Sequence, residues 1–433
     1  MPSAAPSLSI AVLGCGTVGT QVVRLLLEQG EELSARAGTR LELAGIAVRS
    51  LETERDPVVP RDLLTTDAES LVERADVVVE LMGGTERARD LILRGIEAGA
   101  SVVTANKALL ASQYGELFSR ADAAGVDLLF EAAVAGAVPV VRGVRESLAG
   151  DRIERVIGIM NGTTNYVLDA MTTAGWDVDA AVTRAQELGY AEADPTADVD
   201  GHDAAAKAAI LAALAFHTRV DLRDVTREGI RGVTPEDIEA AREAGGVIKL
   251  LGIAERVATP QGERVAVQVH PAVLPLEHPL ASVRGAFNAV VLEAQAAGRL
   301  MFYGAGAGGP ETASAVLGDV VAAARHRVTG GRAPAESTHA TLAPARPADL
   351  GARMQIRLRV ADRPGVLAHV STALAQHGVS IESVRQRPGD DGSATLTVVT
   401  HEARLDALLR TTAALQATTG VEELLSAYRV EQA

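Results

Sequence analysis

The short segment GCGTVG, at residues 14–19, constrains the fold of this chain more than any other feature. It follows an apolar run, LSIAVL, and opens a stretch with helical spacing. In a strand–turn–helix setting, Gly14 permits the tight turn, Gly16 lets the backbone approach a pyrophosphate, and Gly19 allows close helix packing. The segment therefore predicts a dinucleotide site, although a glycine-rich turn taken alone often holds no ligand.

Apolar runs alternate with helical patterns along the first third of the chain. The expected strands are residues 8–13, 41–48, 76–81, 101–106 and 126–134. The expected helices between them are residues 20–33, 88–99 and 108–125. Strands that alternate with helices form βαβ units, whose parallel sheet is covered on both faces. Residues 1–140 are therefore expected to form an α/β domain, a doubly wound sheet of Rossmann type that binds NAD(P).

The pattern changes after the first domain. Two apolar runs, residues 247–257 and 263–270, flank an ATPQG turn and predict a hairpin. Residues 141–327 are expected to form an α+β domain with a partly antiparallel sheet. Residues 328–351, rich in Gly, Pro, Ala and Thr, have no periodicity and predict a linker. Residues 352–433 follow the order βαββαβ, which is typical of a ferredoxin-like module.

Charge and cysteine content exclude several classes of protein. A formal net charge of −15 argues against general nucleic-acid binding and against an anionic membrane surface. No apolar run reaches the roughly 18 residues of a membrane helix, and the N-terminus lacks a secretory pattern. The only cysteine, Cys15, excludes an internal disulfide, and no adjacent histidine activates it as a nucleophile. A cytoplasmic protein is expected.

The end of the second expected strand bears on the choice of nucleotide. NAD-binding domains usually carry an acid there, which holds the ribose 2′-hydroxyl. In this chain the strand ends in Val48–Arg49–Ser50, and the Arg49 guanidinium suits a 2′-phosphate. NADP is therefore preferred, while Glu52 and Glu54 lie close enough in sequence to keep NAD open. The simpler alternative for Arg49 is a solvated charge at a strand end.

Two segments, ELMGG (80–84) and TANKALL (104–110), fall where strands of the sheet finish. Ligands of open α/β sheets bind at the carboxyl ends of the strands. Lys107 is therefore a candidate functional lysine, and the alternative is a surface lysine at the start of a helix.

An acidic stretch, LGYAEADPTADVDGHDAAAK (188–207), holds five carboxylates and closes on Lys207. A calcium loop of the EF-hand type fails, because it would place Thr196 at its first position and Lys207 at its last. A structural reading accounts for two of the acids, with Asp200 as a helix cap and Asp203 in the first turn.

A third reading is a clamp for a substrate that carries a positive charge. The carboxylates would hold an ammonium group, and Lys207 would donate a proton to a carbonyl oxygen during hydride transfer. Asp194 would shape the turn before Pro195.

These residues resemble a known family. The segment AQELGYAEADPTADVDGHDAAAK (185–207) is similar to the signature of homoserine dehydrogenases. Further matching segments occur in the family's order: GCGTVG, ELMGG, TANKALL, FEAAVAGAVP (130–139), NGTTNYVL (161–168) and HPLASVRGAFNAV (278–290). The resemblance covers about residues 8–325, and the C-terminal module resembles an ACT domain through its DRPGVLA segment.

The resemblance implies NAD(P)-dependent interconversion of L-homoserine and L-aspartate 4-semialdehyde, in threonine and methionine biosynthesis. Lys207 matches the proton donor, and Lys107 matches a second catalytic lysine that also contacts the cofactor. The positions that match substrate contacts are Glu192, Asp203, Asp198 and Tyr190. The positions that match cofactor contacts, besides the three glycines of the turn, are Thr17, Val18, Arg49, Gly189 and Gly306.

The family also implies a monovalent cation, sodium, in the segment FEAAVAGAVP. The matching ligands are the Glu131 side chain and the carbonyls of Val134, Gly136 and Val138, and the alternative is an ordinary turn. The ACT module implies allosteric control and a homo-oligomer, a dimer or tetramer. The family implies threonine as the inhibitor, and substrate binding and dimerisation as the role of residues 141–327.

One segment departs from the family's pattern. The glycine segment is GAGAGGPETA (304–313), with Pro310 one place early and Glu311 where proline is usual. Gly306 is still expected beside the cofactor, while the following helix is expected to start differently. Two other functions remain open, a different amino-acid dehydrogenase on the same scaffold and a sensor without catalysis.

Overall fold

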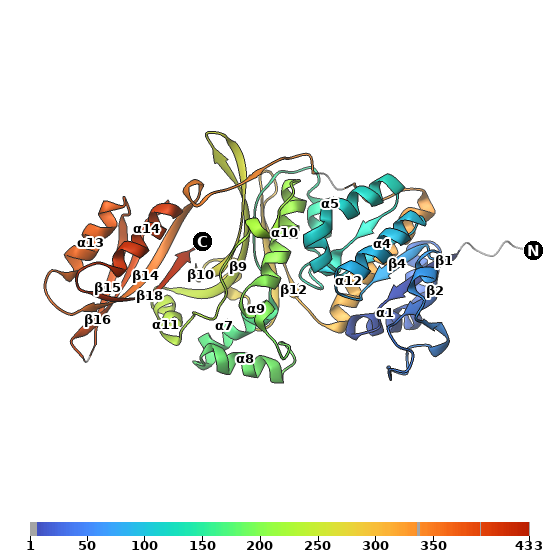
Figure 1. Cartoon of the computed structure of the whole chain (residues 1–433), viewed down its shortest axis with the longest axis horizontal. Coiled ribbons are helices and arrows are strands. Elements are labelled where there is room, and N and C mark those ends of the chain that lie inside the picture. The colour runs from blue at the N-terminus through green and yellow to red at the C-terminus, as the bar shows by residue number, and fades with distance from the viewer. Residues whose placement is uncertain (1–6, 336–337, 390, 433) are drawn as a thin grey trace, which may run out of the picture. The chain divides into compact units, whose positions relative to one another are not determined.

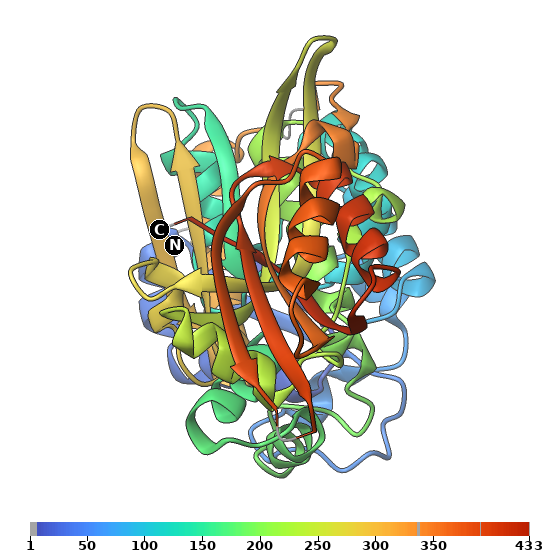
Figure 2. The same ribbon diagram turned by 90° about the vertical axis from the view of Figure 1, so that its left-hand side faces the viewer.

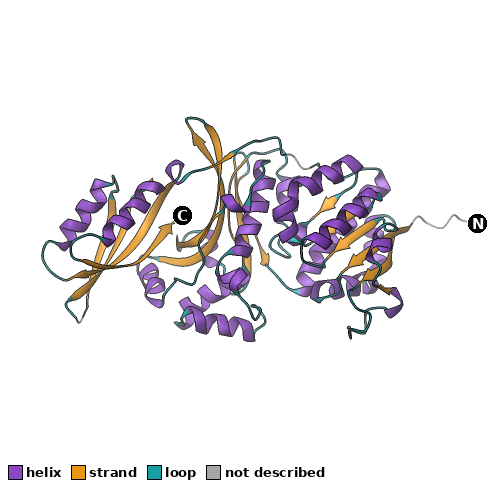
Figure 3. Ribbon diagram, in the orientation of Figure 1, coloured by secondary structure: helices purple, strands orange, loops and turns teal. Residues whose placement is uncertain are grey.

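The computed structural model describes residues 7–335, 338–389 and 391–432 (Figures 1 and 3). The chain divides into two compact units, each built from three segments. The first combines Met1–Val156, Ala205–Val225 and Asn288–Thr341, and the second combines Ile157–Ala204, Thr226–Phe287 and Leu342–Ala433. In the part of the chain that the structure describes, every helix is too short or too polar to cross a membrane.

The first unit contains a six-stranded parallel sheet. Its strands lie in the order β3-β2-β1-β4-β5-β6, with every neighbouring pair parallel. This order is that of the Rossmann fold, and it reverses between β1 and β4, where dinucleotides bind. The strands are β1 (Ser7–Leu13), β2 (Arg40–Ala47), β3 (Leu64–Thr65), β4 (Val77–Glu80), β5 (Ser101–Thr104) and β6 (Leu128–Leu129).

Helices from distant parts of the sequence cover this sheet. Early in the chain these are α1 (Thr17–Glu28), α2 (Gly30–Ala37), α3 (Ala68–Val72), α4 (Glu86–Glu97), α5 (Lys107–Ala124) and α6 (Val140–Arg142). Helix α12 (Gly309–Thr329) returns much later and packs Val316 and Val320 into the core around Ile10 and Val12 of β1. The first unit therefore closes only when a segment almost 300 residues downstream folds onto it.

The expected helix 20–33 is two helices, because α1 ends at Glu28 and α2 starts at Gly30. Glycine is a poor residue inside a helix, with a cost near 1 kcal/mol relative to alanine. The expected strand 126–134 is also shorter, since only Leu128–Leu129 pair with β5. The chain then turns through a 3₁₀ segment at Glu131–Ala133.

The second unit contains the predicted hairpin. Strands β9 (Gly246–Thr259) and β10 (Gly262–Pro275) pair antiparallel over their whole length, which confirms that prediction. The helices and short strand of this region are α7 (Gly162–Ala174), α8 (Val178–Glu187), α9 (Thr196–Val199), α11 (Pro235–Glu243) and β8 (Thr226–Arg227). Helix α10 (His202–Phe216) starts in this unit, which also contains β13 (Ala343–Pro344) and the end of β7 (Ile153–Ile159). Strands β11 (Phe287–Ala294) and β12 (Gly298–Ala305) belong to the first unit, apart from Phe287.

The C-terminal module has the predicted order βαββαβ. Its sheet runs β18-β14-β16-β15, and Figure 2 shows both helices on one side of it. The last two residues that pair in β18, Arg429 and Val430, lie parallel to Ala272 and Val273 of β10, so the module continues the sheet of the hairpin. Its elements are β14 (Gly351–Ala361), α13 (Val366–Gln376), β15 (Ile381–Pro388), β16 (Ser393–Thr400), β17 (Ala403–Arg404), α14 (Leu405–Gln416) and β18 (Val421–Val430).

Candidate active site

The glycine turn of the first unit has the geometry of a dinucleotide site. Gly14 has φ +96°, and a Cβ there would lie 2.7 Å from the Leu81 carbonyl oxygen. A Cβ on Gly19 would lie 2.2 Å from the Gly14 carbonyl oxygen, so only glycine fits both positions. Gly16 is the N-cap of α1 and makes no side-chain cap, and a Cβ there would meet nothing within 4 Å. The start of α1 therefore offers backbone N–H groups to a pyrophosphate.

Two arginines follow β2. Arg49 is exposed immediately after the strand, as predicted from the sequence. Arg55, which the sequence reasoning did not single out, donates to the Cys15 carbonyl at 3.2 Å and to the Ser50 carbonyl at 3.0 Å. This second guanidinium ties the segment after β2 to the glycine turn. In the sequence, Arg55 could be noticed only as a second arginine close to Arg49.

Buried polar groups occupy the ends of β4 and β5. Glu80 accepts hydrogen bonds from Thr104 Oγ1 at 2.7 Å and from the Met82 amide at 2.8 Å, and burial raises the pKa of its carboxyl. Asn106 donates to the Gly84 carbonyl at 2.7 Å, and its Oδ1 caps α5. These contacts place Lys107 as the exposed first residue of α5. ELMGG and TANKALL thus meet at adjacent strand ends, as predicted, while Glu80 and Asn106 are additional polar residues there.

The segment expected to hold a cation forms an unusual turn. Ala135 and Gly136 have φ of 58° and 55°, a conformation that favours glycine. A Cβ on Gly136 would lie 2.6 Å from the Gly306 carbonyl oxygen, and the Ala137 amide donates to the Ala305 carbonyl at 3.1 Å. The predicted loop and the predicted cofactor segment therefore lie side by side.

The Glu131 side chain holds the turn that follows β6. Its two carboxylate oxygens accept from the Val141 and Arg142 amides at 3.0 and 2.8 Å, which turns the chain into α6. Burial and the nearby Asp319 carboxylate raise the pKa of Glu131 to about 7, while Arg142 opposes this. Val134 and Val138 are fully buried, and the Val138 carbonyl accepts from the Val140 amide at 2.8 Å.

This loop fits a hard cation by its donor chemistry. Carboxylate and carbonyl oxygens are its available ligands, and a positive charge beside Glu131 would favour the charged carboxylate. Over residues 7–335, 338–389 and 391–432, no group of three or more His, Cys, Asp or Glu side chains is arranged to hold a metal ion. A cation here would consequently depend on backbone carbonyls.

The glycine segment before α12 accommodates its shifted proline. Helix α12 starts at Gly309 and has Pro310 in its first turn, where a missing N–H costs no helical hydrogen bond. Gly309 lies against α1, because a Cβ there would be 3.2 Å from Thr17 Cγ2. The segment therefore reaches the glycine turn, although Pro310 comes one place early and Glu311 stands where the family usually has proline.

In the second unit one side chain joins two of the predicted acids. Asn161 Nδ2 donates to Asp198 Oδ1 at 2.6 Å and to Asp203 Oδ2 at 2.9 Å. Asp203 is 7% exposed, and Asp198 is half-buried. Lys207 lies one turn after Asp203 on α10 and is 8% exposed. The structure thus pairs Asp198 with Asp203 and presents Lys207 next along the same helix.

Other members of the acidic stretch are placed differently. Tyr190 and Glu192 are exposed, and the Tyr190 carbonyl accepts from Thr163 Oγ1 at 2.6 Å. Gly189, with φ +77°, follows α8 and starts the stretch. Asp194 Oδ1 accepts from the Thr196 amide at 3.0 Å, which confirms the predicted turn.

The prediction that Asp200 caps α10 is wrong. Asp200 ends the short helix α9, and its Oδ1 accepts from Arg231 Nε at 2.5 Å. The arginine lies 31 residues away in sequence, so the local pattern could not reveal this partner. Asp203 does lie in the first turn of α10, as predicted.

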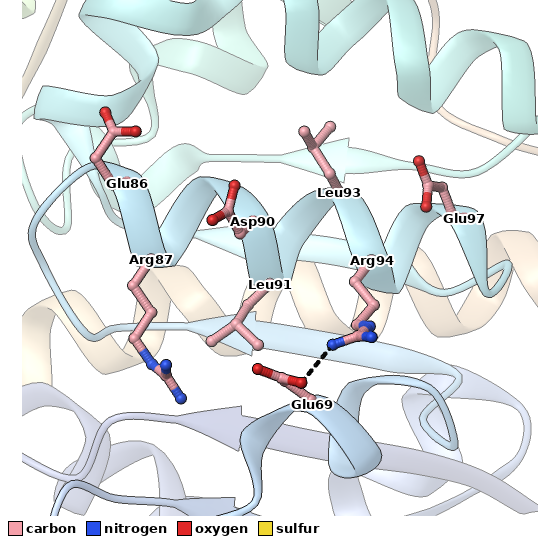
Figure 4. Close-up of a pocket in the computed structure, with 8 residues that line it drawn as sticks. All are labelled: Glu69, Glu86, Arg87, Asp90, Leu91, Leu93, Arg94 and Glu97. Atoms are coloured by element: carbon pink, nitrogen blue, oxygen red, sulfur yellow. Dashed lines mark hydrogen bonds and ion pairs between the residues drawn. The ribbon is translucent and has the colours of Figure 1, made fainter.

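A depression of about 520 Å³ lies along α4, and Figure 4 shows its charged walls. It contains the ion pair of Arg94 with Glu69, at 2.6 Å, and none of the predicted site residues. It belongs to the surface of the first unit rather than to the strand ends.

Comparison with known proteins identifies the family. The model for homoserine dehydrogenase matches residues 139–321, the model for the homoserine dehydrogenase NAD-binding domain matches residues 14–131, and the ACT domain model matches residues 354–417. A homoserine dehydrogenase of Corynebacterium glutamicum is 54% identical, over 98% of this chain and 96% of that protein. One of Mycobacterium tuberculosis is also 54% identical, over 100% of this chain and 99% of that protein.

Solved structures agree with this result. A homoserine dehydrogenase from Thiobacillus denitrificans is 37% identical and has a TM-score of 0.91, over 99% of both chains. A hyperthermophilic archaeal homoserine dehydrogenase in complex with NADPH is 26% identical and has a TM-score of 0.62, over 73% of this chain and 98% of that one. The chain carries a nucleotide-binding domain, a second sheet and an ACT module, and its identity with these proteins shows that it belongs to the homoserine dehydrogenase family of oxidoreductases that act on a CH–OH group.

Proposed function

We propose that this chain catalyses the NAD(P)-dependent interconversion of L-homoserine and L-aspartate 4-semialdehyde. The observation that carries the proposal is the acid pair Asp198–Asp203, held by Asn161 and followed one helical turn later by the buried Lys207. Two carboxylates with a basic residue beside them suit a substrate that carries an ammonium group and a reacting oxygen. An amino-acid alcohol and its aldehyde have both groups.

Each residue has a separate task in this mechanism. Asp203, with Asp198 and with Glu192 and Tyr190 from the exposed loop, binds and orients the substrate ammonium. Lys207 gives a proton to the carbonyl oxygen as the aldehyde is reduced, and takes it back in the reverse direction. Lys107 orients the substrate from the end of β5 and contacts the nucleotide. NADPH, when bound, supplies the hydride.

The pyrophosphate of the nucleotide is held by the first unit in this proposal. Gly14, Gly16, Thr17, Val18 and Gly19 form the pyrophosphate turn at the start of α1, and Gly189 and Gly306 contact the nicotinamide side. Arg49 favours NADP over NAD, because its exposed guanidinium follows β2 where a 2′-phosphate would lie. An acid at that position would have supported NAD.

Sodium is the cation that we propose for the loop at Glu131. The ligands would be the Glu131 carboxylate with the carbonyls of Val134, Gly136 and Val138. The side-by-side position of Gly136 and Gly306 supports a role in shaping the cofactor side of the site. The cation would order the turn in this role and takes no part in the transfer of hydride.

The ACT module is proposed to bind threonine as a feedback inhibitor, and the chain to work in threonine and methionine biosynthesis as a cytoplasmic homo-oligomer. The continuation of the hairpin sheet into β18 supports regulation, since a ligand on the module acts on a strand that pairs with β10. The division into residues 1–140, 141–327, 328–351 and 352–433 remains a prediction.

The test is a homoserine oxidation assay with NAD and with NADP, each in the presence and absence of threonine. We expect oxidation with both nucleotides, a higher kcat/KM with NADP, and inhibition by threonine. Inertness toward homoserine together with oxidation of another amino alcohol would contradict the proposed substrate. Full activity in the presence of threonine would contradict the proposed regulation only.

A further inference from the structure

Asn161 is the N-cap of α7 and the residue on which the two acids converge. Its Oδ1 accepts from the Thr164 amide at 2.8 Å and from Thr164 Oγ1 at 2.9 Å. Its Nδ2 faces the other way and donates to both Asp198 and Asp203. A flipped amide would turn its oxygen toward two carboxylates, so the surrounding groups permit one orientation. All of the hydrogen-bonding capacity of the Nδ2 group is used by the acids.

The type of donor matters as much as its position. Two carboxylates that share one nitrogen repel each other, and some donor must hold them together. A lysine or arginine at position 161 would bring a positive charge of its own and compete with a substrate ammonium. The neutral amide of Asn161 holds the pair and adds no charge to the site.

The helix that carries Asn161 is fixed one turn further along. Lys249 Nζ, fully buried in β9, donates to Asn165 Oδ1 at 2.8 Å and to the Val283 carbonyl at 2.7 Å. Asn165 Nδ2 in turn donates to the Gly285 carbonyl at 2.9 Å. The start of α7 is therefore held by buried hydrogen bonds, and Asn161 presents its amide from a rigid element.

We propose that Asn161 is a positioning residue that sets Asp198 and Asp203 as a pair for the substrate ammonium without adding a positive charge to the site. The proposal rests on the proposed function, because it specifies how that site recognises its substrate. Asn161 in this role contributes to the binding of homoserine and does not affect the binding of the nucleotide.

The test uses Asn161→Ser and Asn161→Asp. Both residues are preferred N-caps, so both keep an acceptor for α7 while removing the two donors. Hydrogen bonds to charged groups are the stronger kind, and we expect KM for homoserine to rise about 10-fold or more, kcat to change less, and KM for NADP to stay constant. Asp177→Ser at the N-cap of α8 is the matched control, and its effect on KM should be within about 2-fold.

The pH profile gives a readout that a purely structural role would not move. The acids of both variants lose donors that favour their charged form, and Asn161→Asp adds a third carboxylate. The acidic limb of kcat/KM for homoserine should therefore shift to higher pH, further in Asn161→Asp than in Asn161→Ser. In a double-mutant cycle with Asp198→Asn, Asn161→Ser should raise KM for homoserine by a smaller factor in the Asp198→Asn protein than in the wild type.

Every outcome decides the proposal. An unchanged KM for homoserine in folded Asn161→Ser would overturn it, as would equal losses in both KM values and kcat. Failure of both variants to fold would also overturn it, since Asn161 would then be a structural residue. A wild-type protein that does not oxidise homoserine would instead contradict the proposed function, whatever the variants do.

Discussion

Arg357 of β14 donates a hydrogen bond to Asp237 of α11, and both side chains are almost fully buried. Asp237 is 0% exposed and also accepts from Ser426 Oγ at 2.6 Å and from Tyr428 Oη at 3.2 Å. A single carboxylate thus joins the face of the ACT sheet to the helix before the hairpin. No local pattern predicted this pair, because 120 residues separate its members.

Arg357→Leu should destabilise the protein strongly. Removing one partner of a buried ion pair leaves an uncompensated charge at Asp237, and we expect a loss of about 3–5 kcal/mol in the free energy of unfolding. Urea unfolding measures this loss. Arg385→Ala is the control, because Arg385 is half exposed and Arg387 also pairs with Glu243, so its loss should stay below about 1 kcal/mol. Similar losses in the two variants would contradict the assigned role of Arg357.

Lys249 should make stability depend on pH in the alkaline range. Burial lowers its pKa from 10.5 to about 8, so the unfolded chain binds this proton more tightly than the folded one. The charged lysine therefore costs stability below the folded pKa, and the cost disappears as the pH rises from about 8 toward 10.5. The free energy of unfolding of the wild type, relative to that of Lys249→Met, should rise by roughly 2–3 kcal/mol between pH values of about 7.5 and 10. A constant difference would show that Lys249 does not titrate in this range.

Lys207→Ala should abolish most turnover while leaving nucleotide binding intact. General acid–base catalysis contributes at least about 100-fold, and Lys207 acts as the base in the oxidation, so kcat for homoserine oxidation should fall by that factor or more. Titration of nucleotide fluorescence should give an unchanged dissociation constant for NADPH. Turnover close to that of the wild type would remove Lys207 from the proposed mechanism.

Arg49→Glu should reverse the preference between nucleotides. The new carboxylate repels a 2′-phosphate and accepts from a ribose hydroxyl, so kcat/KM with NADP should fall at least about 10-fold while that with NAD changes less. Arg40→Glu makes the same change in charge at the other end of β2 and should leave the ratio unaltered. A fall of equal size with both nucleotides would mean that Arg49 does not read the 2′-phosphate.

Sodium should stabilise the wild-type protein specifically. If the cation binds at the Glu131 loop, Tm should be higher in sodium chloride than in tetramethylammonium chloride at equal ionic strength, because a ligand that binds only the folded state raises its stability. Glu131→Gln should remove the difference between the two salts. An identical Tm in both salts for the wild type would argue against the proposed sodium site.

The low lysine content of the chain is a sequence signal for functional positions. The chain has only three lysines, Lys107, Lys207 and Lys249, among its 41 basic residues. Two are the proposed catalytic lysines, and the third is the buried donor behind Asn165. Where arginine supplies nearly all surface cations, each lysine stands at a position that needs a compact ammonium group.

Features that depend on neighbouring residues could be predicted from the amino-acid sequence. The glycine turn, the alternation of strands and helices, the βαββαβ order of the ACT module and the acidic stretch are all local patterns. They follow from backbone sterics and from the periodicity of apolar side chains, and these act over a few residues. Asp194 was correctly placed for the same reason, since its partner is two residues away.

Contacts between residues that are distant in the sequence became apparent only in the folded chain. Asn161 reaches Asp198 and Asp203 across 37 and 42 residues, and Asp200 finds Arg231 instead of the cap expected from its neighbours. Such contacts depend on how helices and sheets pack, because a buried polar group must find a partner wherever the fold places one. The acids were visible in the sequence, but the neutral amide that holds them as a pair became visible only once α7 was folded against the stretch.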